Sequence, residues 1–170
     1  TPEMVDRFES LLDDDLAESA YQQFLGRNPE IIARMMGHES AYVIPEKALG
    51  SEFRCDFVVG ECNSIGFQWQ IFELKRPRDR ITTKTGDVSH ALNVALRQIR
   101  QRRNWLESNV DYASRPANKG GLGLEDIRSF IPASVVIGRR DRLTPECNAT
   151  RNRLLTENRV NVMTYDRILD

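Results

Sequence analysis

The segment FQWQIFELKRP, residues 67–77, decides the fold, because it reads as a buried strand with a charged end. Its first six residues are mostly apolar, and Pro77 ends the backbone pairing of such a strand. Side chains alternate between the faces of a strand, so Glu73 and Lys75 point the same way, about 7 Å apart along the chain. The segment predicts a strand over 67–75 with a carboxylate and an ammonium group at its end.

The segment before it predicts the partner strand. Residues 52–59 form an apolar run that contains Asp56, and GECNSIG at 60–66 supplies a turn, so the two strands form an antiparallel hairpin. In that hairpin Asp56 lies near residues 70–73 and beside Glu73. A charge within an apolar strand is costly unless it is paired or binds a metal ion.

Two neighbouring carboxylates repel each other, and a divalent cation removes that repulsion. Asp56, Glu73 and the backbone carbonyl of Leu74 are hard oxygen ligands that suit Mg²⁺. Lys75 beside such a site can hold an attacking water and neutralise charge that develops on a phosphate. A Glu-x-Lys tripeptide alone is common, however, and its ordinary interpretation is an exposed ion pair between strands.

The rest of the chain predicts helices around this hairpin. Residues 1–37 read as three helices that form a layer, and residues 88–107 as one long helix after a polar loop at 79–86. Shorter elements complete the pattern: strands at 42–44, 133–138 and 160–164, helices at 125–130 and 144–155, a loop at 111–123 and a helical turn at 165–169. A hairpin followed by helical crossovers predicts an α/β fold with a mixed central sheet flanked by helices.

The long helix carries the remaining polar candidate, Gln98, on a flank next to its Leu/Ile stripe. Gln98 hydrogen-bonds a metal-bound water, orients Lys75, or faces solvent. Four bases surround the same helix and either hold a nucleic-acid backbone or form a solvated surface: Arg97, Arg100, Arg102 and Arg103. The two tryptophans, Trp69 and Trp105, are more typical of a core or an interface than of base stacking.

Composition excludes several classes of protein. The 170 residues are 40 % apolar with a net charge of −1, and no stretch approaches the roughly 18 apolar residues of a membrane helix. Three cysteines without a CxxC pair fit reduced thiols, and two histidines offer no zinc cluster. Charge is uneven: residues 1–30 hold eight acids against two bases, and residues 76–103 hold eight bases against two acids. A polyanion would be attracted to the second segment and repelled by the first.

The order Asp56, Glu73-Leu-Lys75 and a helix with Gln98 resembles the PD-(D/E)xK nuclease superfamily, although Cys55 stands where the proline is usual. The chain more closely resembles the nuclease domain of the Shedu anti-phage defence proteins. The resemblance covers most of residues 20–170 and rests on short segments: FLGRNPE at 24–30, FRCDFV at 53–58, FELKRP at 72–77, ALRQI at 95–99, WL at 105–106, VIG at 136–138 and YD at 165–166.

This resemblance implies a restriction-endonuclease-like core and a magnesium-dependent endonuclease. Asp56 and Glu73 would bind Mg²⁺ or Mn²⁺, Lys75 would be catalytic and Gln98 would support the site. The partners would be DNA, which is cut or nicked in the bacterial cytoplasm, and further copies of the chain in a homo-oligomer, with no membrane involved. Residues 1–170 would be a single nuclease-like domain from the C-terminal part of a longer protein, which suits the lack of an initial Met.

Two points stay open. Many members of the superfamily add an acid from a helix before the sheet, and Glu39 and Glu46 are both candidates here. The alternative function is a nucleic-acid-binding or partner-binding module on an inactive nuclease scaffold.

Overall fold

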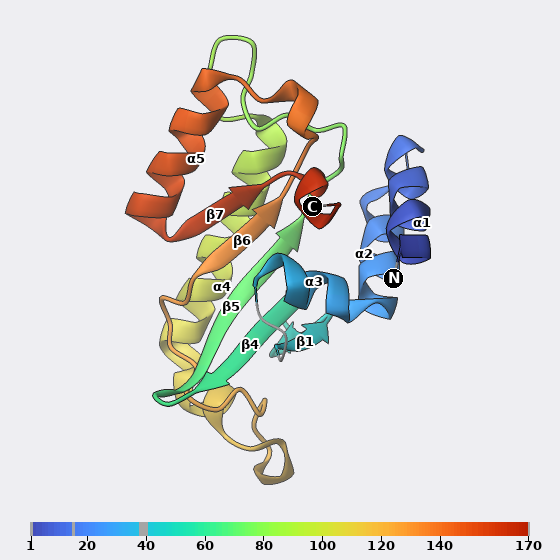
Figure 1. Ribbon diagram of the computed structural model, residues 1–170. Helices are drawn as coiled ribbons and strands as arrows, with labels where there is room; N and C mark the ends of the chain where they lie inside the picture. Colours follow the sequence, from blue (N-terminus) through green and yellow to red (C-terminus); the bar gives the residue numbers. More distant parts are fainter. Residues whose placement is uncertain (1, 15, 38–40, 170) are drawn as a thin grey trace.

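A five-stranded mixed sheet forms the centre of the computed structural model, which describes residues 2–14, 16–37 and 41–169. The strand order is β1-β4-β5-β6-β7, in which β1, β4 and β5 pair antiparallel, and β5, β6 and β7 pair parallel (Figure 1). The strands are β1 (Tyr42–Pro45), β4 (Phe57–Asn63), β5 (Gly66–Leu74), β6 (Ala133–Val136) and β7 (Val160–Met163). The mixed sheet predicted from the sequence is confirmed.

The β4–β5 hairpin is longer than predicted. Gly60, assigned above to the turn, pairs with Trp69 inside the ladder, and only residues 64–65 separate the strands. A Cβ atom on Gly60 would lie 2.4 Å from the Trp69 ring, so the glycine makes room for an indole across the ladder. A glycine inside a strand commonly marks such a close approach, which explains why the turn prediction was wrong here.

The predicted strand over 52–59 is interrupted, and this corrects the position of Asp56. Residues 53–54 form β3 (Phe53–Arg54), which pairs with β2 (Ala48–Leu49) in a separate two-stranded sheet. The main-sheet strand β4 begins only at Phe57, opposite Phe72. Asp56 therefore lies at the bend between two strands, where its side chain reaches across to the end of β5.

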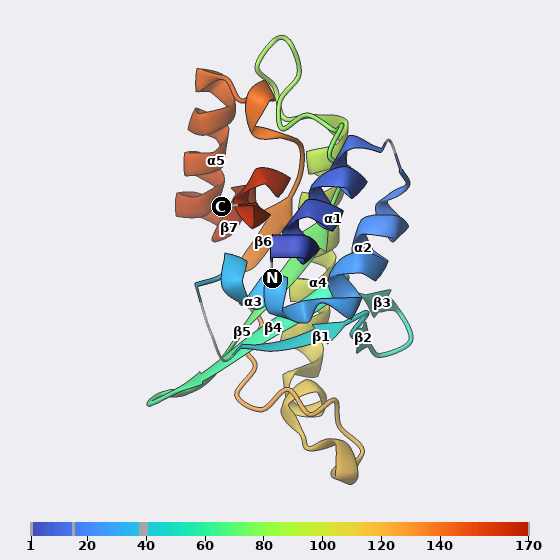
Figure 2. The same ribbon diagram turned by 45° about the vertical axis from the view of Figure 1, so that its right-hand side comes forward.

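Helices cover both faces of the sheet (Figures 1 and 2). One face packs on α4 (His90–Ser114) and α5 (Pro145–Asn158), through a core that includes Ile71, Ile99 and Val135. The other face packs on the first 37 residues, through a core that includes Phe8 and Phe72. These N-terminal helices are α1 (Pro2–Asp13), α2 (Glu18–Arg27) and α3 (Pro29–Met35). These three helices therefore form a layer on that face of the sheet.

Two further predictions differ from the structure. Helix α4 continues to Ser114 across a kink at Asn109, although residues from 111 onward read as a loop. Residues 125–130 form turns rather than a helix, because this segment follows the start of β5: Trp69 Nε1 donates to the Glu125 carbonyl at 2.6 Å, and the Phe67 N–H donates to Asp126 at 3.1 Å.

Short 3₁₀ turns complete the chain at η1 (Ala117–Lys119), η2 (Arg140–Arg142) and η3 (Tyr165–Ile168). Within the described residues no helix is both long enough and apolar enough to cross a membrane.

Candidate active site

Asp56 is held at the bend between β3 and β4 by two donors from different elements. Its Oδ2 accepts the Leu74 N–H at 2.7 Å, and its Oδ1 lies 3.4 Å from Gln22 Nε2 on α2. Burial raises the pKa of the Asp56 carboxyl, and the hydrogen bond from Leu74 opposes that rise. The carboxylate is therefore fixed beside the last residues of β5.

Glu73 on β5 is almost completely buried, with 1 % of its surface exposed. Its Oε1 lies 3.1 Å from Nε of Arg102, a side chain of α4, although the two atoms do not form a well-directed hydrogen bond. Burial raises the pKa of Glu73 to about 8, and the Asp56 carboxylate adds to this rise. The two predicted metal ligands are therefore close enough to repel each other.

Lys75 follows directly after β5 and is held by its backbone and its side chain. Its N–H donates to the Val136 carbonyl at 2.8 Å, and its carbonyl accepts the Tyr165 hydroxyl at 2.5 Å. Its Nζ contacts both carboxylate oxygens of Glu18, the first residue of α2, at 3.1 and 3.2 Å. Lys75 is itself only 6 % exposed, so Glu18 screens its ammonium group from solvent.

The structure thus brings Asp56, Glu73 and Lys75 together at the carboxyl end of β5. Gln98 lies on α4 one turn before Arg102, the ion-pair partner of Glu73, and its backbone carbonyl accepts a hydrogen bond from Arg102 Nη1 at 3.0 Å. No hydrogen bond joins Gln98 to Lys75, so the predicted orientation of the lysine by Gln98 is absent from this structure. Glu18 holds the lysine instead.

Glu18 is the site residue that sequence reasoning missed. Of the acids considered above, Glu39 lies outside the described residues, and Glu46 is an exposed residue whose carboxylate pairs with Arg54 at 3.4 Å. Burial raises the pKa of Glu18, and Lys75 opposes that rise. No local signal distinguishes Glu18 from the other acids near the N-terminus, because its position depends on how α2 packs over the end of β5.

The donor set fits a divalent cation that prefers oxygen ligands. Buried Oε1 atoms of Glu73 and Gln98 both lack a hydrogen-bond donor among the described residues, and a buried acceptor without a donor is costly unless something else satisfies it. The described residues contain no group of three or more His, Cys, Asp or Glu side chains placed to hold a metal ion. Asp56 and Glu73 would therefore need amide or carbonyl oxygens and waters to complete a magnesium site.

Two of the four arginines on α4 have structural contacts rather than a free surface. Arg102 is buried against Glu73, and Arg103 donates to three backbone carbonyls: those of Ile131, Asn158 and Arg159. Of the four arginines, Arg97 and Arg100 are exposed. Arg102 is buried and Arg103 is half-buried, so Arg97 and Arg100 are the two of these bases whose side chains stay available for a nucleic-acid backbone.

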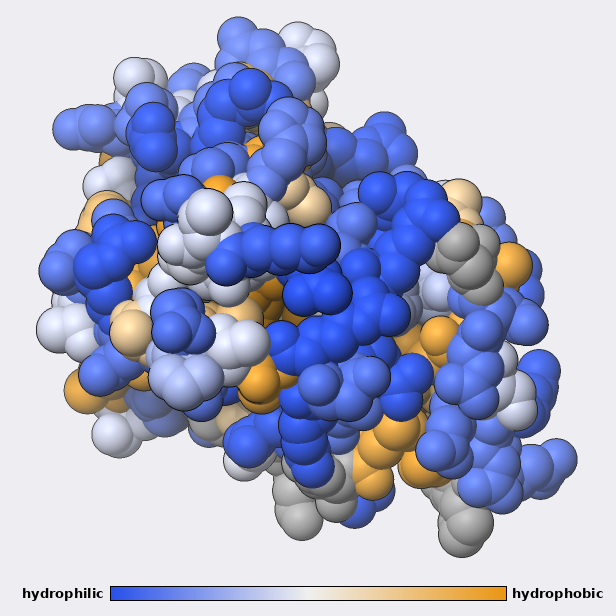
Figure 3. All heavy atoms as spheres, turned by 90° about the horizontal axis from the view of Figure 1, so that it is seen from above, coloured by the Kyte–Doolittle hydropathy of each residue, from blue (hydrophilic) through white to orange (hydrophobic). Residues whose placement is uncertain are grey.

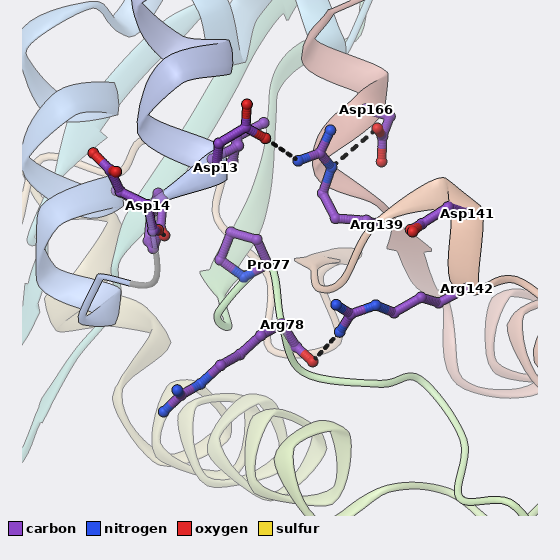
Figure 4. A pocket seen from close by; sticks show the side chains of 10 residues that line it. Asp13, Asp14, Pro77, Arg78, Arg139, Asp141, Arg142 and Asp166 are labelled. Atoms are coloured by element: carbon purple, nitrogen blue, oxygen red, sulfur yellow. Dashed lines mark hydrogen bonds and ion pairs between the residues drawn. The ribbon is translucent and has the colours of Figure 1, made fainter.

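A polar pocket of about 570 Å³ opens beside the site, between the N-terminal layer and the loops that follow β5 and β6 (Figure 4). Arg139 lies in it between Asp13 and Asp166, and Arg142 donates to the Arg78 carbonyl at 2.7 Å. Its lining consists of Leu12, Asp13, Asp14, Tyr21, Pro77, Arg78, Arg139, Asp141, Arg142 and Asp166, none of which is a predicted site residue. Figure 3 shows that this end of the molecule is covered mainly by hydrophilic residues.

The raised pKa of Glu73 predicts a specific dependence of stability on pH in the metal-free protein. Between pH 4.5 and about 8, the Glu73 carboxyl keeps its proton in the folded protein but loses it in the unfolded chain. The contribution to stability is therefore complete below pH 4.5 and is lost as the pH rises through 8. We expect the melting temperature measured with EDTA to fall as the pH rises from 4.5 to about 8, and to fall less in Glu73→Gln. Equal slopes in both proteins would contradict the assignment.

A mixed sheet with Asp56 at the start of one strand and Glu73-x-Lys75 at the end of the next is the arrangement expected of the PD-(D/E)xK nuclease class. The family model described as "Shedu protein SduA, C-terminal" matches residues 15–169. The chain belongs to this family, which confirms the resemblance found in the sequence and supports, in general terms, a nuclease associated with defence.

A solved structure described as an "EndoMS-dsDNA2 complex" is similar to this chain at 18 % sequence identity and a TM-score of 0.42. The match covers 89 % of this chain and 46 % of the other, so this chain spans less than half of that protein's length. No significant match is found among the curated proteins.

Proposed function

We propose that this protein is a metal-dependent DNA endonuclease that hydrolyses or nicks phosphodiester bonds in bacterial anti-phage defence. The observation that carries the proposal is the convergence of Asp56, Glu73 and Lys75 at the end of β5. Two buried oxygens, Oε1 of Glu73 and Oε1 of Gln98, lack hydrogen-bond donors there. Membership of the Shedu family supports the same function.

In this proposal Asp56 and Glu73 hold Mg²⁺ or Mn²⁺, and Gln98 supports the site with its unpaired amide oxygen. The cation, when bound, lowers the pKa of a water and polarises a phosphoryl oxygen. Asp56 is kept in place by the Leu74 N–H, so it needs little rearrangement to act as a ligand.

Lys75 would stabilise the negative charge that grows on the phosphate as water attacks and the bond to the leaving oxygen breaks. Its ammonium is now held by Glu18 alone, so a phosphate that reaches Lys75 must displace or share that contact. Glu18 acts as the partner that holds the lysine between reactions.

DNA as the substrate rests on the family and on the uneven charge of the chain, with Arg97 and Arg100 exposed on α4. The single nuclease domain over 1–170, the homo-oligomer and the cytoplasmic location stay predictions.

Removal of the metal tests the proposal directly. We expect the purified chain to convert supercoiled plasmid to nicked or linear DNA with Mg²⁺ or Mn²⁺, and EDTA to abolish the conversion. Addition of excess Mg²⁺ after EDTA should restore it. Cleavage that persists in EDTA would contradict the proposed mechanism.

A second function, a DNA-binding or partner-binding module without catalysis, is favoured by one observation. Both side chains already lie beside an oppositely charged group of the protein, Glu73 beside Arg102 and Lys75 beside Glu18. This function predicts a gel-mobility shift with DNA and no cleavage in any divalent metal. A calorimetric titration in which Mn²⁺ binding depends on Asp56 and Glu73 would favour the nuclease instead.

A further inference from the structure

Arg102 is a buried arginine whose contacts all lead to the candidate site. It projects from α4 and is 6 % exposed. Its Nη2 donates to the Arg54 carbonyl at 2.5 Å, its Nη1 donates to the Gln98 carbonyl at 3.0 Å, and its Nε lies 3.1 Å from Glu73 Oε1.

The contacts to Arg54 and Glu73 join α4 to two other elements, and the contact to the Gln98 backbone carbonyl lies within α4. Arg54 ends β3 two residues before Asp56, Glu73 lies on β5, and Gln98 lies one turn earlier on α4. The planar guanidinium has five N–H donors in a fixed arrangement, so its position constrains all three partners at once. Arg102 therefore links the backbone two residues before Asp56 to the carboxylate of Glu73.

Burying a guanidinium is expensive unless its charge is compensated, and Glu73 is the one carboxylate that an ion pair of the described residues joins to it. A hydrophobic residue at this position would avoid that cost, so core packing alone does not explain an arginine here. Arg102 Nε lies near Oε1 without a well-directed hydrogen bond, so this buried oxygen keeps its capacity to accept from another group.

We propose that Arg102 is a positioning residue of the metal site: it holds the Glu73 carboxylate and the backbone that leads into Asp56 in the arrangement that a divalent cation requires. This inference rests on the proposed function, because it presupposes that Asp56 and Glu73 bind the cation. Partners that orient metal-ligating side chains commonly contribute 10-fold to 100-fold to metal affinity.

The test is a calorimetric titration of the purified chain with Mn²⁺, in the parent, Arg102→Met, Arg102→Lys and Arg103→Met. We expect Arg102→Met to bind Mn²⁺ about 10-fold to 100-fold more weakly than the parent. Arg102→Lys keeps the charge but not the planar guanidinium, and its affinity for Mn²⁺ should lie between those of the parent and Arg102→Met. Arg103→Met is the matched control, because it removes a hydrogen-bonded arginine from the same helix without a contact to the site, and it should keep the parent affinity.

Plasmid cleavage gives a second readout that a general loss of stability would not produce. In Arg102→Met, raising the Mn²⁺ concentration should restore most of the parent kcat, because the defect lies in metal affinity. A folded Arg102→Met protein, checked by circular dichroism, that binds Mn²⁺ as tightly as the parent would overturn the role of Arg102 alone. If Arg102→Met does not fold, Arg102→Lys decides: about tenfold weaker binding supports the proposal, and parent affinity overturns it. A parent chain that binds no Mn²⁺ would overturn both the proposed function and this inference.

Discussion

Asp56→Asn is expected to reduce metal-dependent plasmid cleavage by about a thousandfold or more. The metal ion supplies several kcal/mol of stabilisation, and each 1.4 kcal/mol corresponds to about tenfold in rate. Asparagine has nearly the same shape and keeps an oxygen that can accept the Leu74 N–H, so the bend between β3 and β4 should survive. Initial rates of nicking over a range of Mn²⁺ concentrations measure the effect.

Asp126→Asn is the matched control for that substitution. Asp126 also accepts a backbone N–H from β5, that of Phe67, but at the opposite end of the strand. Its cleavage rate should stay within about twofold of the parent, since surface substitutions away from special features change little. An Asp56→Asn protein that cleaves at the parent rate would remove Asp56 from the metal site.

Lys75→Met is expected to lower kcat by about 100-fold to 1000-fold, the usual cost of removing one group that stabilises developing charge. Methionine fills similar space, so the buried surroundings of residue 75 should be retained. The metal ligands are unchanged in this variant, so Mn²⁺ affinity should remain close to that of the parent. Calorimetry and nicking rates on the same preparation separate the two quantities.

Lys47→Met tests whether the loss of a hydrogen-bonded lysine explains the effect. Lys47 Nζ donates to the Leu122 carbonyl at 2.7 Å, and no side-chain hydrogen bond or ion pair of the described residues joins it to Glu18, Asp56 or Glu73. We expect this control to cleave at nearly the parent rate. Parent-like cleavage by Lys75→Met would show that the lysine has no role in the reaction.

The predictable part of the fold is the part in which local pattern and tertiary packing agree. The alternation of residues 67–75 and the apolar run at 133–138 gave the two central strands, because each strand is buried on both faces. The predictions for the turn after β4 and for residues 125–130 were wrong, because contacts between residues distant in sequence decide both structures. Gly60 accommodates Trp69, and Glu125 accepts a hydrogen bond from that same indole. A single sequence does not reveal such pairs.

The candidate site also contains residues that the sequence predicts and residues that depend on tertiary packing. The hairpin register predicts from the sequence that Asp56 lies near Glu73 at the end of the central strand. The bend that holds Asp56 before β4 and the contact of Lys75 with α2 depend on tertiary packing. Glu18 and Arg102 reach the site from helices, and their place depends on the packing of α2 and α4 against the sheet. Arg102 lies four residues after Gln98 on the same helix flank, but it is also one of four bases around the helix, and that pattern does not indicate which base is buried against a carboxylate.

The hydrogen bond from the Tyr165 hydroxyl to the Lys75 carbonyl links residues 90 positions apart. During translation Lys75 emerges long before β6, β7 and the turn that carries Tyr165. Strand β5, which carries Glu73 and ends just before Lys75, lacks its parallel neighbour β6 until residue 136 has been made. The Lys75 carbonyl lacks the Tyr165 hydroxyl until residue 165 has been made. A nascent chain on the ribosome therefore carries the acidic and basic residues of the site without the scaffold that assembles them.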